Sequence, residues 1–431
     1  MFHFISLFIC VFCLFFHTPA RGQDRPVQQE MEEILIYVQD SNPTLKAAQA
    51  ELQATMELYP QARSGWLPSL SGEASLYATN IDASNFNNGD GATTKDMTLR
   101  LDQPIWHGGR TFAEAGRAKD LIRAGHATLR QHKQNLLFDV VTAYMDVLRD
   151  RQLFVLYQRN EGILAQEVQS AQERFDIGEL TETDVQQAKA RQAKAQSLRL
   201  LAARDLHVSN AKYEEFVGMK VPANMLFPLG YKHLPNDLQQ MLTQAQEINP
   251  DLQIATYKHQ ASEHEADAVF RELLPQISAF ASVNKQYDPQ PGIIADSQVE
   301  TIGLRASIDL FRGGKTHSRV RQARAEAKRK GYNIEEVKRR IEQDITSNWR
   351  AYRAAVLQAQ TIQNEIDAAK LALEGVREEA SLGQRTIMDI LDADEDVIEA
   401  QVLHARAKRD EVVAQYALAR SIGLPLAARP E

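Results

Sequence analysis

Two kinds of hydrophobic spacing alternate along this chain, and each kind occurs twice. In the first kind, apolar and polar residues alternate with a period of two, which is typical of a β-strand with two different faces. Four stretches follow this pattern as two pairs, one pair after Leu67-Pro68 and one after Leu274-Pro275. We therefore predict four strands. Their apolar positions are Leu70, Gly72, Ala74, Leu76 and Ala78; Met97, Leu99 and Leu101; Ile277, Ala279, Ala281 and Val283; and Ile302, Leu304, Ala306, Ile308 and Leu310.

The second kind of spacing has the period of an α-helix. Two segments, from Gly109 to Gly178 and from Gly314 to Gly383, run for 69 residues without a proline. A helix of that length spans roughly 100 Å at about 1.5 Å per residue, which no compact domain needs. On the first segment we expect a buried stripe. Its members are Leu136, Leu137, Val140, Val141, Tyr144, Val147 and Leu148.

Two shorter helical segments, 184–217 and 389–422, are expected to return alongside the long ones. Each has about half the required length, so we expect a second short helix to be stacked on its end. Chain order suggests that residues 236–271 complete the first returning arm and that residues 27–58 complete the second.

The two halves of the chain repeat each other. The segments RFDIGELTETDVQQA from Arg174 and EASLGQRTIMDILDA from Glu379 lie 205 residues apart, and each is expected to form a turn between two long helices. Thr183-Asp184 and Met388-Asp389 are expected to begin the outgoing helices. Each strand pair ends in an aromatic residue and two glycines, Trp106-His107-Gly108-Gly109 and Phe311-Arg312-Gly313-Gly314, where the glycines allow the chain to swivel into a helix. We predict structural repeats at 23–218 and 219–431, each comprising a helix, two strands and a long helical hairpin.

The first residues have the pattern of a secretory signal. Residues 2–16 are apolar, and Ala20-Arg21-Gly22 offers small residues for cleavage, so we assign 1–22 as a signal peptide. An uncleaved anchor is the alternative, because no Lys or Arg precedes the apolar run. Cys10 and Cys13, the two cysteines of the chain, both lie in this run, so the mature protein has no disulfide.

Charge and motifs narrow the function classes. The formal net charge of -8 argues against a nucleic-acid partner. The eleven histidines form no HExxH pair, and neither a GxSxG motif nor a P-loop is present, so we expect no enzyme and no cofactor or metal site. The helical patterns alone also fit a periplasmic coiled-coil scaffold or adaptor without a pore. Tandem hairpins that each follow a strand pair favour a channel, because four strands cannot close a barrel and several chains must share one.

Taken together, these features resemble the TolC family of outer-membrane channel proteins. The resemblance covers nearly the whole mature chain and rests on the tandem repeat, the ARSGWLPSLSG run from Ala62, the two aromatic-x-Gly-Gly junctions, and the tips IGELTETDVQQAKA and LGQRTIMDILDA. It implies an α+β membrane protein. In the family, a homotrimer contributes four β-strands per chain to a 12-stranded outer-membrane barrel, and long helices to a 12-helix tunnel that extends into the periplasm.

The resemblance also implies a function. Family members are passive outer-membrane exit ducts of tripartite export systems, docked to a periplasmic adaptor protein and to an inner-membrane ABC or proton-driven transporter. They serve type I protein secretion, drug efflux or both, and they contact outer-membrane lipid. Residues at the hairpin turns would meet the adaptor. These are Gly178, Leu180, Thr181, Gly383 and Thr386.

The family pattern further implies a gate at the second tip. Asp389 and Asp392 lie one helical turn apart and match aspartates that ring the pore constriction, where crowding is expected to raise some of their pKa values. Arg385 matches an arginine that locks the closed state against the first tip, where Thr183 and Asp184 match its partners. The chain departs from the best-known pattern at Ala380, which replaces a tyrosine, so we expect a looser lock.

Overall fold

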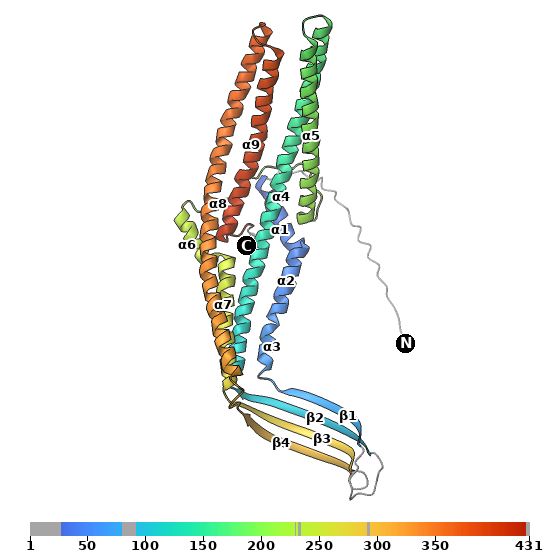
Figure 1. Cartoon of the computed structure of the whole chain (residues 1–431), viewed down its shortest axis with the longest axis vertical. Coiled ribbons are helices and arrows are strands. Elements are labelled where there is room, and N and C mark those ends of the chain that lie inside the picture. Colours follow the sequence, from blue (N-terminus) through green and yellow to red (C-terminus); the bar gives the residue numbers. More distant parts are fainter. Residues whose placement is uncertain (1–26, 80–91, 229, 232–233, 291–293, 428–431) are drawn as a thin grey trace, which may run out of the picture.

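Helices form a long rod, and a single sheet extends from one end of it (Figure 1). The computed structural model describes residues 27–79, 92–228, 230–231, 234–290 and 294–427, so the predicted signal peptide lies outside the described residues. In chain order the elements are α1 (Val27–Ser41), α2 (Pro43–Met56), α3 (Leu58–Ser64), β1 (Ser69–Thr79), β2 (Ala92–His107), α4 (Arg110–Asp176), α5 (Glu182–Val217), α6 (Leu238–Ile248), α7 (Pro250–Phe270), a 3-10 turn η1 (Arg271–Leu273), β3 (Gln276–Gln290), β4 (Ile294–Ser307), α8 (Lys315–Ser381) and α9 (Ile387–Ile422).

The four predicted strands form one antiparallel sheet in the order β1-β2-β3-β4, so β1 and β4 are its edges within the chain. The register aligns their apolar positions, because Leu70 pairs with Leu101, Leu101 with Ala281, and Ala281 with Ile302. Since side chains alternate between faces, the next row is polar. It consists of Ser71, Arg100, Ser282 and Thr301.

The prediction that the last strand continues through Ile308 and Leu310 was wrong. β4 ends at Ser307, which pairs with Gln276, the first residue of β3. Beyond Ser307 the described part of the chain offers β4 no further pairing partner. Ile308 and Leu310 therefore keep the apolar alternation but do not form a strand.

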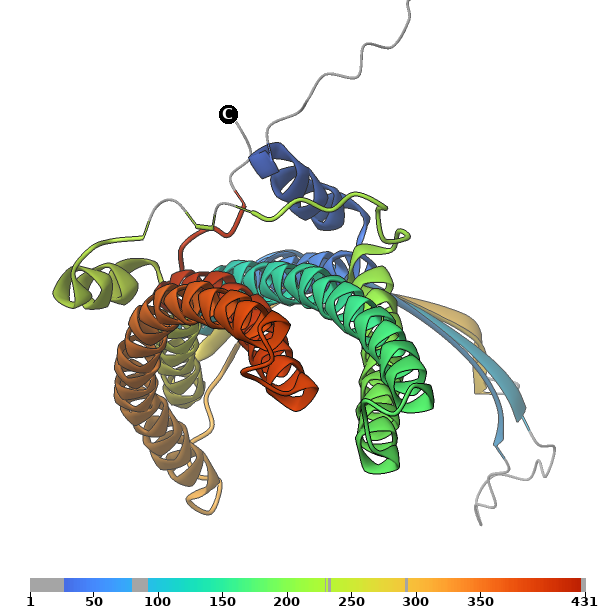
Figure 2. The same ribbon diagram turned by 90° about the horizontal axis from the view of Figure 1, so that it is seen from above.

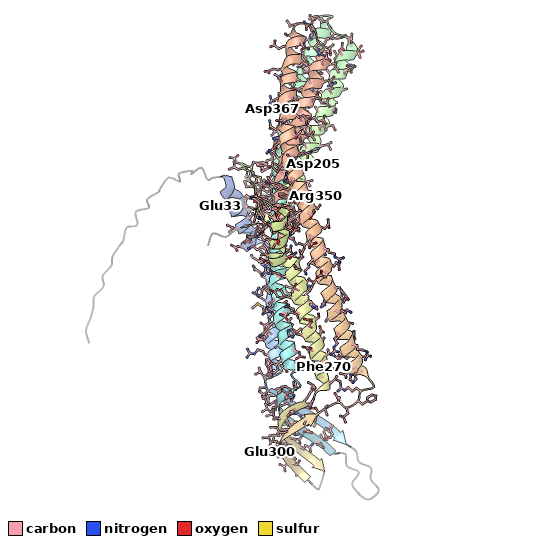
Figure 3. All side chains as sticks on the ribbon, turned by 90° about the vertical axis from the view of Figure 1, so that its left-hand side faces the viewer. Glu33, Asp205, Phe270, Glu300, Arg350 and Asp367 are labelled. Atoms are coloured by element: carbon pink, nitrogen blue, oxygen red, sulfur yellow. The ribbon has the colours of Figure 1, made fainter. Side chains whose placement is uncertain are left out.

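The swivel role of the double glycines is confirmed. Gly109 and Gly314 each have φ of +79°, and Gly108 and Gly313 have φ of +61° and +59°. These left-handed conformations favour glycine and turn each strand pair directly into a long helix. Phe270, the last residue of α7, lies at the end of the rod next to the sheet, whereas Glu300 lies on the sheet (Figure 3).

Two helical hairpins, α4 with α5 and α8 with α9, form the other end of the rod. Each has an incoming helix of 67 residues and an outgoing helix of 36 residues. Seen from above, the four helices form a curved row in the order α8, α9, α4, α5 (Figure 2). None of the described helices combines the length and apolar content needed to cross a lipid bilayer.

The returning arms are completed by short helices, but the predicted pairing was wrong. α5 ends against α2, where the Asn42 side-chain amide donates to the Phe216 carbonyl at 2.8 Å. α9 ends against α7, where the Asn249 amide donates to the Ser421 carbonyl at 2.8 Å. Each asparagine also accepts a backbone N–H at the start of the helix that its following proline begins. The Asn-Pro steps therefore cap one helix and hold the end of another.

The main hydrophobic core lies near the middle of the rod. There α1, α6 and the ends of α5 and α9 pack on the middle of α4 and α8. The predicted stripe on α4 is confirmed: Val140, Val141 and Val147 are fully buried, and the Tyr144 hydroxyl donates to the Leu226 carbonyl at 2.7 Å. Toward the tips the buried apolar residues form only small separate clusters.

Candidate functional site at the hairpin tips

Both hairpins turn at a glycine with a left-handed backbone. Gly178 has φ of +82° and Gly383 has φ of +77°. In the first turn the Glu179 N–H donates to the Arg174 carbonyl at 2.8 Å, and in the second the Gln384 N–H donates to the Glu379 carbonyl at 2.9 Å. These bonds satisfy carbonyls that the ends of α4 and α8 leave open. The predicted turns are therefore confirmed, and the two tips have the same geometry.

A capping box begins each outgoing helix. The Thr181 hydroxyl accepts the Asp184 N–H, and the Asp184 carboxylate accepts the Thr181 N–H at 3.0 Å. Thr386 and Asp389 repeat this arrangement, with the Thr386 N–H donating at 2.8 Å. These bonds to the threonines lower the pKa of Asp184 and Asp389. The outgoing helices begin two residues earlier than predicted, because the caps are the threonines at 181 and 386. The predicted Asp184 and Asp389 do act near the N-termini, as the third helical residues.

Asp389 and Asp392 begin α9 one turn apart, as predicted, but have different partners. Asp389 closes its own capping box, whereas Asp392 accepts a hydrogen bond from Arg191 of α5. In the single chain the pKa of Asp389 is therefore lowered. The predicted rise in pKa applies to carboxylates of several chains that crowd together, so it stays a prediction. Behind them lies Asp394, whose side chain is 11% exposed and whose pKa is raised by burial.

Arg385 does not reach the first tip within the chain. Its Nε donates to a Glu379 carboxylate oxygen at 2.8 Å, inside its own hairpin, and this hydrogen bond raises its pKa. The Asp184 carboxylate instead accepts a hydrogen bond from the Thr181 hydroxyl. The tips of the two hairpins also stand apart (Figure 1). A lock between Arg385 and the first tip remains a prediction for contacts between chains.

Three charged residues that join the hairpins near the tips were missed from the sequence. Arg191 lies 3.5 Å from Glu395 as well as bonding Asp392, and Lys194 also pairs with Glu395. Arg191 and Lys194 are three residues apart on α5, and their acidic partners are three residues apart on α9. That spacing places each pair on one helix face and was visible, but nothing in the sequence indicated that these two faces meet.

The predicted docking residues Gly178, Leu180, Thr181, Gly383 and Thr386 all lie in or beside the two turns. A Cβ atom added at either glycine would meet nothing within 4 Å, so the tips present open surface. Over the described ranges, no group of three or more His, Cys, Asp or Glu side chains could hold a metal ion.

Comparison with known proteins gives a consistent result. The sequence model of a family described as "Outer membrane efflux protein" matches residues 37–218 and 241–424. The outer membrane efflux protein BepC of Brucella suis is 30% identical over 94% of this chain and 88% of its own length. The outer membrane protein TolC of Escherichia coli is 23% identical over 89% of this chain and 80% of its own.

A third relative is named for secretion and a solved structure shares the fold. The alkaline protease secretion protein AprF of Pseudomonas aeruginosa is 22% identical over 87% of this chain and 80% of its own. The solved structure of CusC, described as forming a transmembrane channel, superposes with a TM-score of 0.80 at 14% identity and covers 93% of each chain.

Proposed function

This chain belongs to the outer membrane efflux protein family, and on that premise we propose that it is the passive exit duct of a tripartite export system. It is an outer-membrane protein whose helical rod extends into the periplasm. The duct itself carries out no reaction. In the proposed system, an inner-membrane transporter supplies the energy and selects the substrate, and a periplasmic adaptor joins the transporter to the duct.

One observation carries the proposal: a four-stranded sheet with two open edges and an exposed apolar row extends from two helical hairpins (Figure 1). Leu70 and Ile302 in that row are 67% and 87% exposed. Unpaired strand edges are prohibitively costly in lipid, so the sheet needs other copies on both sides. Three copies would close a 12-stranded barrel, which is wide enough for a lumen. The curved row of helices would likewise close into a 12-helix tunnel (Figure 2).

We place adaptor docking at the two tips. Gly178 and Gly383 are surrounded by open space, so a bulky side chain there would project toward a partner. Gly178→Arg should abolish export while leaving membrane insertion intact. Gly178→Asn is the matched control, since asparagine tolerates positive φ and adds little bulk. Equal loss in both variants would mean that the glycine serves the turn alone.

We place the pore constriction at Asp389 and Asp392 of three chains, where a ring of carboxylates would favour cations. Arg385 would lock this constriction by contacting Thr183 and Asp184 of a neighbouring chain. For the constriction to close, Arg385 would have to leave Glu379 of its own chain and bind Thr183 and Asp184 of the neighbouring chain. Replacing Arg385 with serine should raise the conductance of single trimers, and unchanged conductance would remove it from the lock.

The names of the relatives support two classes of inner-membrane partner. BepC is named for efflux and AprF for protease secretion, so both a proton-driven pump and an ABC transporter fit. Identification of the genes beside this one separates the two, because an adjacent ABC transporter with an adaptor indicates type I secretion.

The oligomer tests the proposal directly. Extracted in mild detergent from outer membranes, the protein should have three times the protomer mass and should form ion-conducting channels in planar bilayers. A soluble monomer without channel activity would instead support a periplasmic scaffold or adaptor, the alternative that the helical pattern leaves open.

A further inference from the structure

Three ion pairs among four residues cross from the first hairpin to the second just inside the tips. Arg191 bonds Asp392 and lies 3.5 Å from Glu395, while Lys194 pairs with Glu395. Arg191 is the best packed of the four, with its side chain 23% exposed, against 65% for Asp392. The cluster contains two positive and two negative groups, so it is neutral while the hairpins are together. We refer to these four residues as the inter-hairpin clamp.

A thin apolar layer lies beneath the clamp. Leu164 of α4, Ala195 of α5 and Leu391 of α9 are buried against one another. Around this layer runs a groove of about 340 Å³, whose remaining charged lining residues are Asp394, Glu399 and Arg406. The apolar contact between the hairpins is therefore small here, and long charged side chains supply much of what joins α5 to α9.

We propose that Arg191 and Lys194 mask the carboxylates of Asp392 and Glu395, and that separation of the hairpins exposes them. This inference rests on the proposed channel function. While the hairpins are joined, Asp392 of the constriction is paired with Arg191 of α5, whereas Asp389 has no basic partner on α5. Opening leaves the net charge of the clamp unchanged, but it moves the two carboxylates, which stay on α9 beside Asp389, away from the two cations on α5. The α9 side of the entrance therefore attracts cations more strongly as it widens. The clamp thus sets the charge of the entrance as well as its closure.

Two variants distinguish this role from simple packing. Arg191→Gln with Lys194→Gln breaks the clamp and leaves both carboxylates unmasked. Asp392→Asn with Glu395→Gln breaks the same pairs and leaves both cations unmasked. In planar bilayers both variants should conduct at least about twofold more than wild type, but the ratio of cation to anion permeability should rise in the first and fall in the second. Because the loss of two positive or two negative charges alone shifts the ratios in these directions, the test of the clamp is the higher conductance of both variants, which Lys189→Gln should not share.

A conservative variant supplies the rescue. Arg191→Lys with Lys194→Arg keeps both cations opposite Asp392 and Glu395 and should return conductance to the wild-type value. Lys189→Gln is the control, because Lys189 is exposed on α5 and has no acidic group within 4 Å among the described residues. Unchanged conductance in both clamp-breaking variants, in a wild type that conducts, would overturn the clamp and leave the channel intact.

A second measurement does not depend on channel activity. Amide hydrogen exchange of 387–398 in the detergent-solubilised protein should be several-fold faster in the Arg191→Gln, Lys194→Gln variant than in wild type or Lys189→Gln. Equal exchange in all three would overturn the clamp even if no channel formed, whereas missing channels with accelerated exchange would count against the proposed function alone.

Discussion

At the residue scale, the capping boxes make the tips sensitive to acid. Hydrogen bonds from Thr386 lower the pKa of Asp389 below its ordinary value of 3.8. An acid whose pKa is lower in the folded state stabilises that state above the unfolded pKa, and the stabilisation is lost as pH falls through the folded pKa. Thr386→Ala should cost the start of α9 about 1 kcal/mol at neutral pH.

Hydrogen exchange of the first turns of α9 measures this loss. Thr361→Ala is a suitable control, because the Thr361 hydroxyl donates to the Leu357 carbonyl one turn back in the middle of α8 and caps no helix. If Thr386→Ala and Thr361→Ala accelerate local exchange equally, the capping box adds nothing to the tip.

Asp394 should show the opposite pH dependence. Burial raises its pKa, and Arg377 opposes that rise. An acid whose pKa is higher in the folded state stabilises that state below the unfolded pKa, and the contribution is lost as pH rises through the folded pKa. Asp394→Asn should therefore slow local exchange of α9 at neutral pH and have little effect near pH 3. Faster exchange at neutral pH would show that the ion pair with Arg377 outweighs the burial.

The sequence predicted the residues of the turns because their roles are local. Gly178 and Thr386 act on neighbours within five positions, and a glycine followed by a threonine and an aspartate identifies such a turn. Arg191 was missed because its partner Asp392 is 201 residues away. The threonine caps were placed two residues late, since an aspartate can serve either as the cap or as the third helical residue.

At the element scale, two asparagines decide which helices are stacked. Asn249 is 2% exposed, caps α7 and donates to the Ser421 carbonyl of α9. Asn249→Ala would leave buried groups on both helices without partners, at a cost of about 2 kcal/mol. Asn364→Ala on the exposed face of α8 is the matched control and should be nearly neutral.

Limited proteolysis and hydrogen exchange at the end of α9 report the difference between these two variants. Comparable protection in both would mean that apolar packing around Ile422, rather than the asparagine, holds the junction.

The lengths of the helical segments showed that each returning arm needs a second helix, but they did not show which helix completes which arm. Helix length and periodicity are local properties, whereas stacking depends on side chains that meet across 174 residues for Asn42 and 172 residues for Asn249. Both Asn-Pro steps were visible as breaks in the helical pattern. Their side-chain amides, each of which joins two helices of the same repeat, had no signal in the spacing.

At the scale of the whole molecule, the strand pattern was predictable because alternation fixes which residues share a face. The extent of β4 was not, since a strand ends where its partner ends and the partner lies elsewhere in the sequence. The same limit applies to the oligomer: the open edges of β1 and β4 show that the sheet is incomplete, and the number of copies follows only from the closure that we propose.

Two neighbouring positions on β4 test which face of the sheet meets lipid. Ile302 belongs to the exposed apolar row and Thr301 to the polar row, so their side chains point to opposite faces. In the proposed barrel, Ile302→Lys places a charge in the hydrocarbon layer and should destabilise the inserted trimer by about 2–4 kcal/mol per chain. Thr301→Lys places the same charge toward the lumen and should change stability little.

Urea unfolding from lipid vesicles measures the stability of the two variants, and the heat-modifiable trimer band gives a second readout. Equal effects would mean that neither face is lined by lipid, whereas a larger effect at Thr301 would reverse the orientation of the sheet.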